Sequence, residues 1–367
     1  MRAILTANAG LVFGGLMTFI MMGAGQSLYG PALPAFARDF GIGTGTAGLL
    51  VSAHWVGAAI GVAVMYLRGT QVSPRMVLGT MAVGAALVGA GLGWPVTLAG
   101  AVIFGVGYGG STVIWNRRFL GVFGPKGPSM LALLNAIFAI GAIGAPLVFV
   151  WIGSDPQLAY LGVAALAVVT FVGVGSGAGP VASAPATGPF APRPAILIFG
   201  ALAIGMEACL IGLGPVALIA LGAGEVEVAE ALSMFFVAFL LARLTLVGFA
   251  SAIAPFTLFL LAVGGAAVLA TAAALTAATW LFVPMGAVAS LFFPGFYMTG
   301  VAQMGDDPRV SPILVAAGLV GGIVSPVLVG AMMVRAGDTV FFPVIAGIAF
   351  CTAGAALVLM RRMNRTA

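Results

Sequence analysis

Charged side chains are scarce in this sequence: lysine, arginine, aspartate and glutamate together make up 6% of its 367 residues. A soluble globular domain carries about 25% charged residues, because its surface must be solvated by water. The 14 basic and 9 acidic residues are too few to cover a water-facing surface of this size. Their scarcity excludes an ordinary cytosolic enzyme, a disordered chain and a collagen-like fibre.

Cysteine and histidine are scarce as well, with two cysteines and one histidine. Cys209 and Cys351 both lie in apolar runs without metal-ligand spacing, so we interpret them as small core residues. The sequence has no CxxC or HxxxH spacing and no GxxxxGK[ST] phosphate loop. We therefore expect no metal site, no cofactor, no direct use of ATP and no enzymatic activity.

Apolar residues are abundant, at 62%, and they form long runs that indicate an integral membrane protein. Charges, prolines and glycine clusters divide these runs into twelve segments, most of which reach the roughly 20 residues that cross a bilayer. The segments are 9–35, 46–67, 76–93, 96–117, 129–152, 157–175, 195–221, 228–245, 255–272, 275–303, 311–335 and 339–360. The pattern predicts an all-α fold with twelve transmembrane helices.

One segment rich in Gly, Pro, Ala and Ser, SGAGPVASAPATGPFAPRP at 176–194, interrupts the apolar pattern and reads as a flexible connector. It divides the chain into an N-terminal six-helix bundle at 1–175 and a C-terminal six-helix bundle at 195–367. Equal span counts in the two halves suggest duplicated bundles that face each other across a central cavity.

The basic residues predict the orientation in the membrane. With a cytoplasmic N-terminus, twelve basic residues lie at inner span ends and only Arg38 and Arg335 lie at outer ends. The inner set is Arg2, Arg68, Arg75, Arg117, Arg118, Lys126, Arg193, Arg243, Arg309, Arg361, Arg362 and Arg365. This asymmetry follows the positive-inside rule. It predicts a bacterial-type inner (plasma) membrane protein with both termini and the connector in the cytoplasm.

Glu207 is the sharpest functional signal, because it lies about 18 Å into the seventh span at 1.5 Å per residue. A carboxylate at that depth is costly unless it is protonated or faces a polar cavity. It is either a proton-coupling or substrate-binding acid, which we favour, or a structural carboxyl bonded to a neighbouring helix. His54, in the second span, has two interpretations. It is a functional residue that binds substrate or relays a proton, or it is a neutral imidazole that packs beside Trp55.

Other polar and aromatic side chains in the spans are candidates for substrate binding. Gln26 and Tyr29 are three residues apart and share one helix face, and Asn116 and Asn135 lie near the inner ends of the fourth and fifth spans. All four are cavity-wall groups or interhelical hydrogen-bonding groups.

The tenth span carries an aromatic group around Pro294, which breaks the backbone ladder of its helix. Its members are Phe292, Phe293, Phe296 and Tyr297. Of these, Phe293 and Tyr297 are the substrate-binding candidates, and packing against lipid is the alternative. Met206 and Met234 have thioethers that could carry cuprous copper, although accidental placement is expected among 17 methionines.

Four strings in chain order carry a family resemblance. They are Asn116 with its following basic loop and LALLNAIFAIGAIGAP (131–146), IGMEACLIGLGP (204–215), LFFPGF (291–296) and GLVGGIVSPVLVG (318–330). Together they resemble the major facilitator superfamily over nearly the whole chain, and within it the fucose–galactose–glucose permease branch of sugar/proton symporters. The resemblance implies the major facilitator fold and puts Glu207 where that branch often has an acid.

The chain departs from the pattern of that family in two places. The loop between spans two and three usually reads G-x-x-x-D-[RK]-x-G-[RK], but here Met65 stands at the acid position, and Arg68 and Arg75 are the only charges. The branch also tends to carry an acid in the first or fourth span, and this chain has none in either. Sugar specificity therefore does not follow from the resemblance. We take Arg68, Arg75 and Arg243 as candidate gating residues.

The sequence thus predicts a secondary active transporter that moves a small solute, sugar-like or not, by alternating access with proton coupling through Glu207. The alternatives are an importer of copper or of a vitamin such as riboflavin, and a non-transporting membrane chaperone or receptor on the same fold. The expected partners are the solute, protons and the lipid bilayer. We expect no nucleic acid and a monomer.

Overall fold

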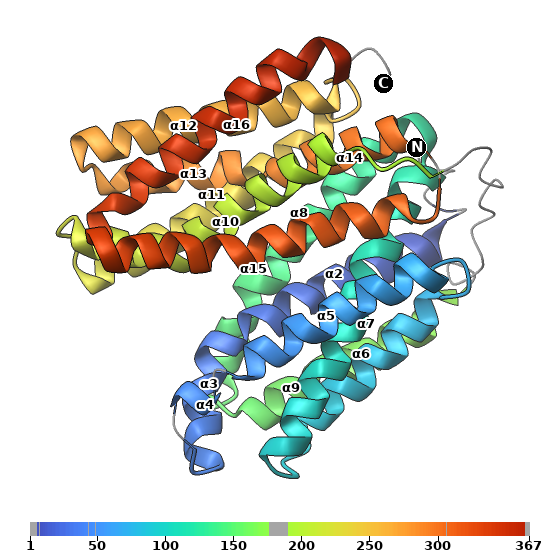
Figure 1. The fold of residues 1–367 in the computed structure, drawn as a ribbon. Coiled ribbons are helices and arrows are strands. Elements are labelled where there is room, and N and C mark those ends of the chain that lie inside the picture. Colours follow the sequence, from blue (N-terminus) through green and yellow to red (C-terminus); the bar gives the residue numbers. More distant parts are fainter. Residues whose placement is uncertain are drawn as a thin grey trace. The chain divides into compact units, whose positions relative to one another are not determined.

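The computed structural model describes residues 6, 8–42, 44–47, 49–175, 190–305 and 307–363. Throughout these residues the secondary structure is helical, with turns and short loops and no strand (Figure 1). The chain divides into two compact units, an N-terminal unit of residues 1–184 and a C-terminal unit of residues 185–367. Most of the connector, residues 176–189, lies outside the described part of the chain.

Two helices of the N-terminal unit, α6 and α9, begin at residues whose side chains cap the helix. The N-cap Ser73 accepts a hydrogen bond from the Met76 amide, and Asp155 caps another helix through the amides of Gln157 and Leu158. A proline follows each cap at the first helical position, where its missing N–H costs nothing. The elements are α2 (Ala9–Ser27), α3 (Tyr29–Asp39), α4 (Thr44–Ala47), α5 (Leu49–Arg68), α6 (Pro74–Gly89), α7 (Trp94–Val122), η1 (Gly124–Lys126), α8 (Gly127–Trp151) and α9 (Pro156–Gly173).

The C-terminal unit is likewise built from apolar helices, and proline is the first residue of two of them, α10 and α12. Its elements are α10 (Pro194–Ala220), α11 (Glu225–Phe249), α12 (Pro255–Thr276), η3 (Thr279–Leu281), α13 (Phe282–Ala289), α14 (Phe292–Met304), α15 (Val310–Ala336), η4 (Asp338–Val340) and α16 (Phe341–Met363).

The predicted spans correspond closely to these helices. In the described part of the chain, eleven helical segments are long and apolar enough to cross a membrane, and α6 is a shorter apolar helix at the position of the third predicted span. The predicted all-α fold with twelve membrane helices is confirmed. Two spans predicted as single runs are each divided into two helices, the first at Leu28 and the tenth at Ser290 and Leu291.

Glycine lets α5 and α7 approach each other to backbone contact. A Cβ atom added at Gly57, Gly61, Gly105 or Gly109 would collide with a backbone carbonyl oxygen of the facing helix. Helices in lipid gain their association energy from such close packing, because lipid tails are as apolar as the side chains. This contact fixes the position of His54, one turn before Gly57 on α5.

The two units pack their helices by the same plan. In the N-terminal unit α2 contacts α8, α5 contacts α7 and α6 contacts α9, and the corresponding pairs in the C-terminal unit are α10 with α15, α11 with α13 and α12 with α16. Glycine mediates the first pair in both: Gly23 and Gly141 between α2 and α8, Gly205 and Gly321 between α10 and α15. The repeated plan is that of a duplicated helical bundle.

Candidate functional site

Three of the predicted binding residues lie in one polar cluster of the N-terminal unit. The ring centroids of Tyr29 and His54 are 5.3 Å apart, and those of His54 and Tyr108 are 4.8 Å apart in an edge-on arrangement. The Tyr108 hydroxyl donates a 2.8 Å hydrogen bond to Oε1 of Gln26. Tyr108, which is not among the residues predicted from the sequence, therefore connects α2, α5 and α7.

His54 is completely buried, and neither ring nitrogen has a hydrogen-bond partner. Its imidazole is enclosed by aromatic rings, those of Trp55 at 5.2 Å and Phe104 at 5.6 Å in addition to the two tyrosines. A neutral imidazole has one donor and one acceptor nitrogen. A buried polar group without partners costs about 1–3 kcal/mol, so His54 holds unused hydrogen-bonding capacity at the expense of stability.

Tyr160 of α9 closes the same cluster at the break between α2 and α3. Its ring centroid lies 6.0 Å from that of Tyr29, and its hydroxyl donates to the Gly25 carbonyl at 3.2 Å. The ring centroid of Phe36 on α3 lies 6.2 Å from that of Tyr160. Tyr108 and Tyr160 could have been found in the sequence, since tyrosine is rare in this chain and both lie within apolar spans.

Asn116 and Asn135 form a separate interhelical pair. Nδ2 of Asn135 on α8 donates to Oδ1 of Asn116 on α7 at 3.1 Å, and each amide also donates to a backbone carbonyl one turn earlier on its own helix. Both side chains are buried. These bonds correspond to the interhelical alternative considered from the sequence, while a solute-binding role for the pair stays a prediction.

The two gating candidates of the N-terminal unit are exposed. Arg68, the last residue of α5, donates to Gln71 at 3.5 Å, and Arg75 in the first turn of α6 lies 5.9 Å from the Phe171 ring centroid. Met65, at the position where the superfamily has an acid, is buried. A thioether cannot form an ion pair with either arginine, so the usual acid latch has no counterpart at this position.

In the C-terminal unit, Glu207 lies in the middle of α10, and its Oε2 atom is buried without a hydrogen-bond partner. Arg243 of α11 is close enough to interact electrostatically with this carboxyl group. The two side chains lie on helices of the C-terminal unit that contact each other.

Arg243 lies deeper than its predicted position at an inner span end, because α11 continues to Phe249 rather than ending near residue 245. The side chain is buried, its Nε donates to the Ser290 carbonyl at 3.0 Å, and its guanidinium carbon lies 4.2 Å above the Phe239 ring. Arg243 is thus held inside the unit rather than in a loop, and its gating role stays untested.

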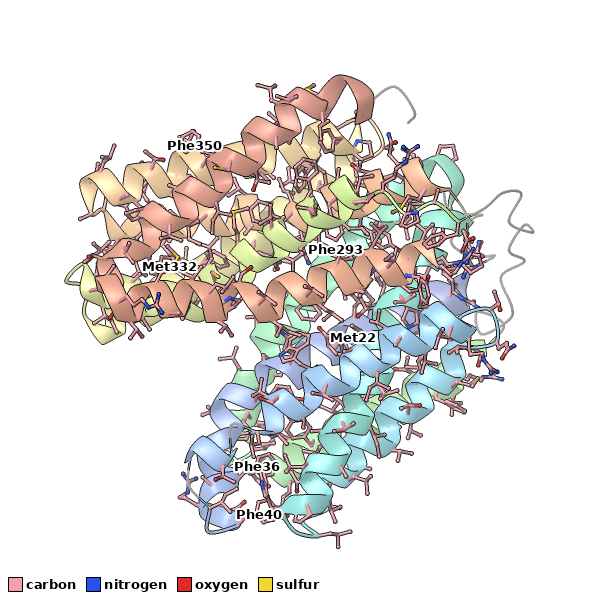
Figure 2. All side chains as sticks on the ribbon, viewed as in Figure 1. Met22, Phe36, Phe40, Phe293, Met332 and Phe350 are labelled. Carbon is pink, nitrogen blue, oxygen red and sulfur yellow. The ribbon has the colours of Figure 1, made fainter. Side chains whose placement is uncertain are left out.

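The aromatic group of the tenth span lies on α14, just after the break at Ser290 and Leu291. Phe293 is labelled in Figure 2. Its ring stacks on that of Tyr297 with the centroids 5.2 Å apart, and the hydroxyls of Tyr297 and Ser311 are 2.6 Å apart. Tyr297 is completely buried. Its hydroxyl therefore ties α14 to α15, and Phe293 offers the more accessible face of the pair.

Within the described residues no group of three or more His, Cys, Asp or Glu side chains could hold a metal ion. Met206 is buried, whereas Met234 is half exposed. Cys209 is buried as expected, but the expectation of a core position is wrong for Cys351, which is exposed on α16. An apolar run in a membrane protein also faces lipid, so apolar surroundings in sequence do not imply burial.

The chain resembles solved transporters over nearly its full length. A fucose:proton symporter from E. coli, FucP, matches with a TM-score of 0.75 and 17% identity, over 96% of this chain and 99% of that chain. The proton:xylose symporter XylE matches with a TM-score of 0.71 and 12% identity, over 96% of this chain and 95% of that chain. The human organic anion transporter TETRAN matches with a TM-score of 0.66 and 14% identity, over 97% of this chain and 99% of that chain. No family model and no curated protein sequence matches.

These similarities establish the fold. The chain has the twelve-helix fold of major facilitator superfamily transporters, as the sequence resemblance implied. At 12–17% identity the similarity concerns the architecture alone.

Proposed function

We propose that this protein is a secondary transporter that moves a small solute across a membrane by alternating access, coupled to protons through Glu207. The observation that carries the proposal is the Glu207 carboxyl group, buried in a membrane helix with Oε2 unpartnered and with a cation as its neighbour. Intramembrane ionisable residues commonly mark substrate or proton pathways. The fold similarity to FucP and XylE, both described as proton symporters, supports the same interpretation.

The polar cluster of the N-terminal unit supplies the proposed solute contacts in that unit. Gln26, Tyr29 and His54 carry hydrogen-bonding groups. Both nitrogens of His54 and the hydroxyl of Tyr29 are buried without a hydrogen-bond partner. In the C-terminal unit the Phe293 ring offers an apolar face. A solute with hydroxyl or carbonyl groups would satisfy the residues of the N-terminal cluster.

Transport by the purified protein in proteoliposomes tests this proposal. An inward-directed proton gradient should drive accumulation of one member of a panel that includes sugars, riboflavin and cuprous ions, and dissipating the gradient with a protonophore should abolish it. Accumulation without dependence on the gradient would contradict proton coupling. Absence of flux and of counterflow for every member of the panel would favour a non-transporting chaperone or receptor.

A further inference from the structure

The last residues before α10 pack on the loop between α14 and α15. α10 begins at Pro194, and the residues just before it are 190–193. The guanidinium carbon of Arg309, the N-cap residue of α15, lies 4.4 Å from the centroid of the Phe190 ring. A guanidinium within about 6 Å of an aromatic ring centroid forms a cation–π interaction. The end of the connector is therefore attached to a loop that is distant in the sequence.

Asp307 fixes the position of this arginine. Its carboxylate oxygens accept hydrogen bonds from Nε of Arg309 at 3.0 Å and from Nη2 at 2.7 Å, and Oδ1 also accepts from the Arg309 amide at 2.8 Å. The Asp307 side chain is 9% exposed, whereas that of Arg309 is 42% exposed. A bidentate pair of this kind holds the planar guanidinium in one orientation. Here it holds the guanidinium over the Phe190 ring.

A second contact attaches the same segment to the end of α14. The backbone amide of Arg193 donates to Sδ of Met304, the last residue of α14, at 3.3 Å. Gly305 follows with φ +76°, a conformation that favours glycine, and ends the helix. Residues 190–193, which we call the strap, therefore contact the loop on both its α14 side and its α15 side.

The helices joined by the strap carry candidate residues of the C-terminal unit. α10 carries Glu207, and α14 carries Phe293 and Tyr297. The Tyr297 hydroxyl lies 2.6 Å from that of Ser311, which is two residues after Arg309 in the first turn of α15. A displacement of the α14–α15 loop would therefore be transmitted to Tyr297 through the start of α15.

We propose that the strap is a conformational device that docks reversibly on Arg309 and holds the adjoining ends of α10, α14 and α15 in one arrangement. The docking is reversible because Arg309 is partly exposed, and cation–π contacts at exposed sites are weaker than those in desolvated sites. The role of the strap in transport rests on the proposed function. A transporter that alternates its access must move its helices against one another, and the docked strap opposes that movement.

Chymotrypsin tests the docking without a solute. The protease cleaves after an accessible aromatic residue, and Phe190 is followed by alanine. Arg309→Gln should raise the rate of cleavage between residues 190 and 191 in the detergent-solubilised protein about fivefold, measured by mass spectrometry of the two fragments. Phe190→Tyr keeps an aromatic ring and should be cleaved as slowly as the wild type. Arg335→Gln, at the other end of α15, is the matched control and should have no effect.

The role of Asp307 in the docking has its own test. Asp307→Asn should also raise the cleavage rate, because the guanidinium loses its bidentate partner. The double variant with Arg309→Gln should be cleaved no faster than Arg309→Gln alone. Equal cleavage of the wild type and Arg309→Gln would overturn the docking, and additive effects of the two substitutions would show that Asp307 does not act through Arg309.

Amide hydrogen exchange tests whether the docked strap holds α14. In Arg309→Gln the amides of the last turn of α14, residues 301–304, should exchange about fivefold faster than in the wild type, while those in the middle of α12 should not change. Phe190→Ala leaves the ion pair between Arg309 and Asp307 in place and should accelerate the same amides. Unchanged exchange in both variants would overturn the proposal, because the strap would then be attached to the loop without constraining the helix.

A transport measurement tests the functional consequence. Arg309→Gln and Phe190→Ala should each raise the rate of counterflow about threefold without changing the half-saturating solute concentration, because the movement no longer requires release of the strap. An unchanged rate would overturn the role of the strap in transport. If the wild-type protein moves no solute at all, the proposed function fails, while cleavage and amide exchange still decide whether the strap docks.

Discussion

Two polar residues of this chain lie in apolar surroundings, where they lower the stability of the fold. Glu207 and His54 each carry a buried atom without a hydrogen-bond partner. Each therefore costs stability that an apolar side chain of similar size would not. Buried polar residues that lack a hydrogen-bond partner and do not stabilise the fold are therefore the ones to test for function.

Glu207→Gln tests the proton role directly, because the substitution keeps the shape and hydrogen-bonding capacity of the side chain but removes its titration. We expect it to abolish accumulation against a gradient while counterflow exchange of the solute continues. The measurement is uptake and exchange of radiolabelled solute in proteoliposomes. Accumulation by the variant would refute proton coupling at this residue, and loss of both activities would identify a solute ligand or a structural contact instead.

His54→Phe should separate stability from binding. A phenyl ring fits among Tyr29, Phe104 and Tyr108 and removes the two unpartnered nitrogens. We expect the free energy of unfolding to rise by about 1 kcal/mol and solute affinity to fall at least about tenfold, measured by thermal melting and by isothermal titration. Unchanged affinity would show that His54 is a core residue, and Phe13→Leu, on an exposed position of α2, is a neutral control.

At the scale of elements, the positions of glycine and proline decide how the helices pack and where they break. Pro294 interrupts its helix, as predicted from the sequence. The interruption lies at Ser290 and Leu291, because the hydrogen bond that proline cannot donate belongs to the carbonyl of the residue four positions earlier. The division of the first span at Leu28, three residues before Pro31, was not predicted. Span length and hydropathy carry no information on such breaks.

Gly105→Ala tests the contact between α5 and α7. The added methyl group would overlap the His54 carbonyl oxygen, and both backbones would have to move. We expect the free energy of unfolding to fall by about 1–3 kcal/mol, which is measured as a lower melting temperature in detergent. Gly162→Ala in α9, where nothing lies within 4 Å of the new atom, should be neutral or slightly stabilising. Equal effects of the two substitutions would contradict close packing at Gly105.

At the scale of the whole molecule, the charge asymmetry predicts that both termini and the connector lie in the cytoplasm. Ser183→Cys, in the part of the connector outside the described residues, should resist membrane-impermeant maleimide in intact cells and react after permeabilisation. The native Cys209 and Cys351 are first replaced by alanine, so that only the new thiol reports. Labelling in intact cells would show that the connector lies outside the cytoplasm and would contradict the predicted topology.

The sequence alone determined the class and the architecture of this protein, because hydropathy and charge act through the solvent and do not depend on which helices are neighbours. Twelve spans, two halves and a deep carboxyl group at Glu207 follow from them. The tertiary structure decided which polar groups meet: Tyr108 joins Gln26 to His54, and Asn116 pairs with Asn135. It also turned Arg243 inward to the Ser290 carbonyl. Such contacts depend on the rotation and separation of packed helices, which glycine positions set and which a linear pattern of apolar residues does not encode.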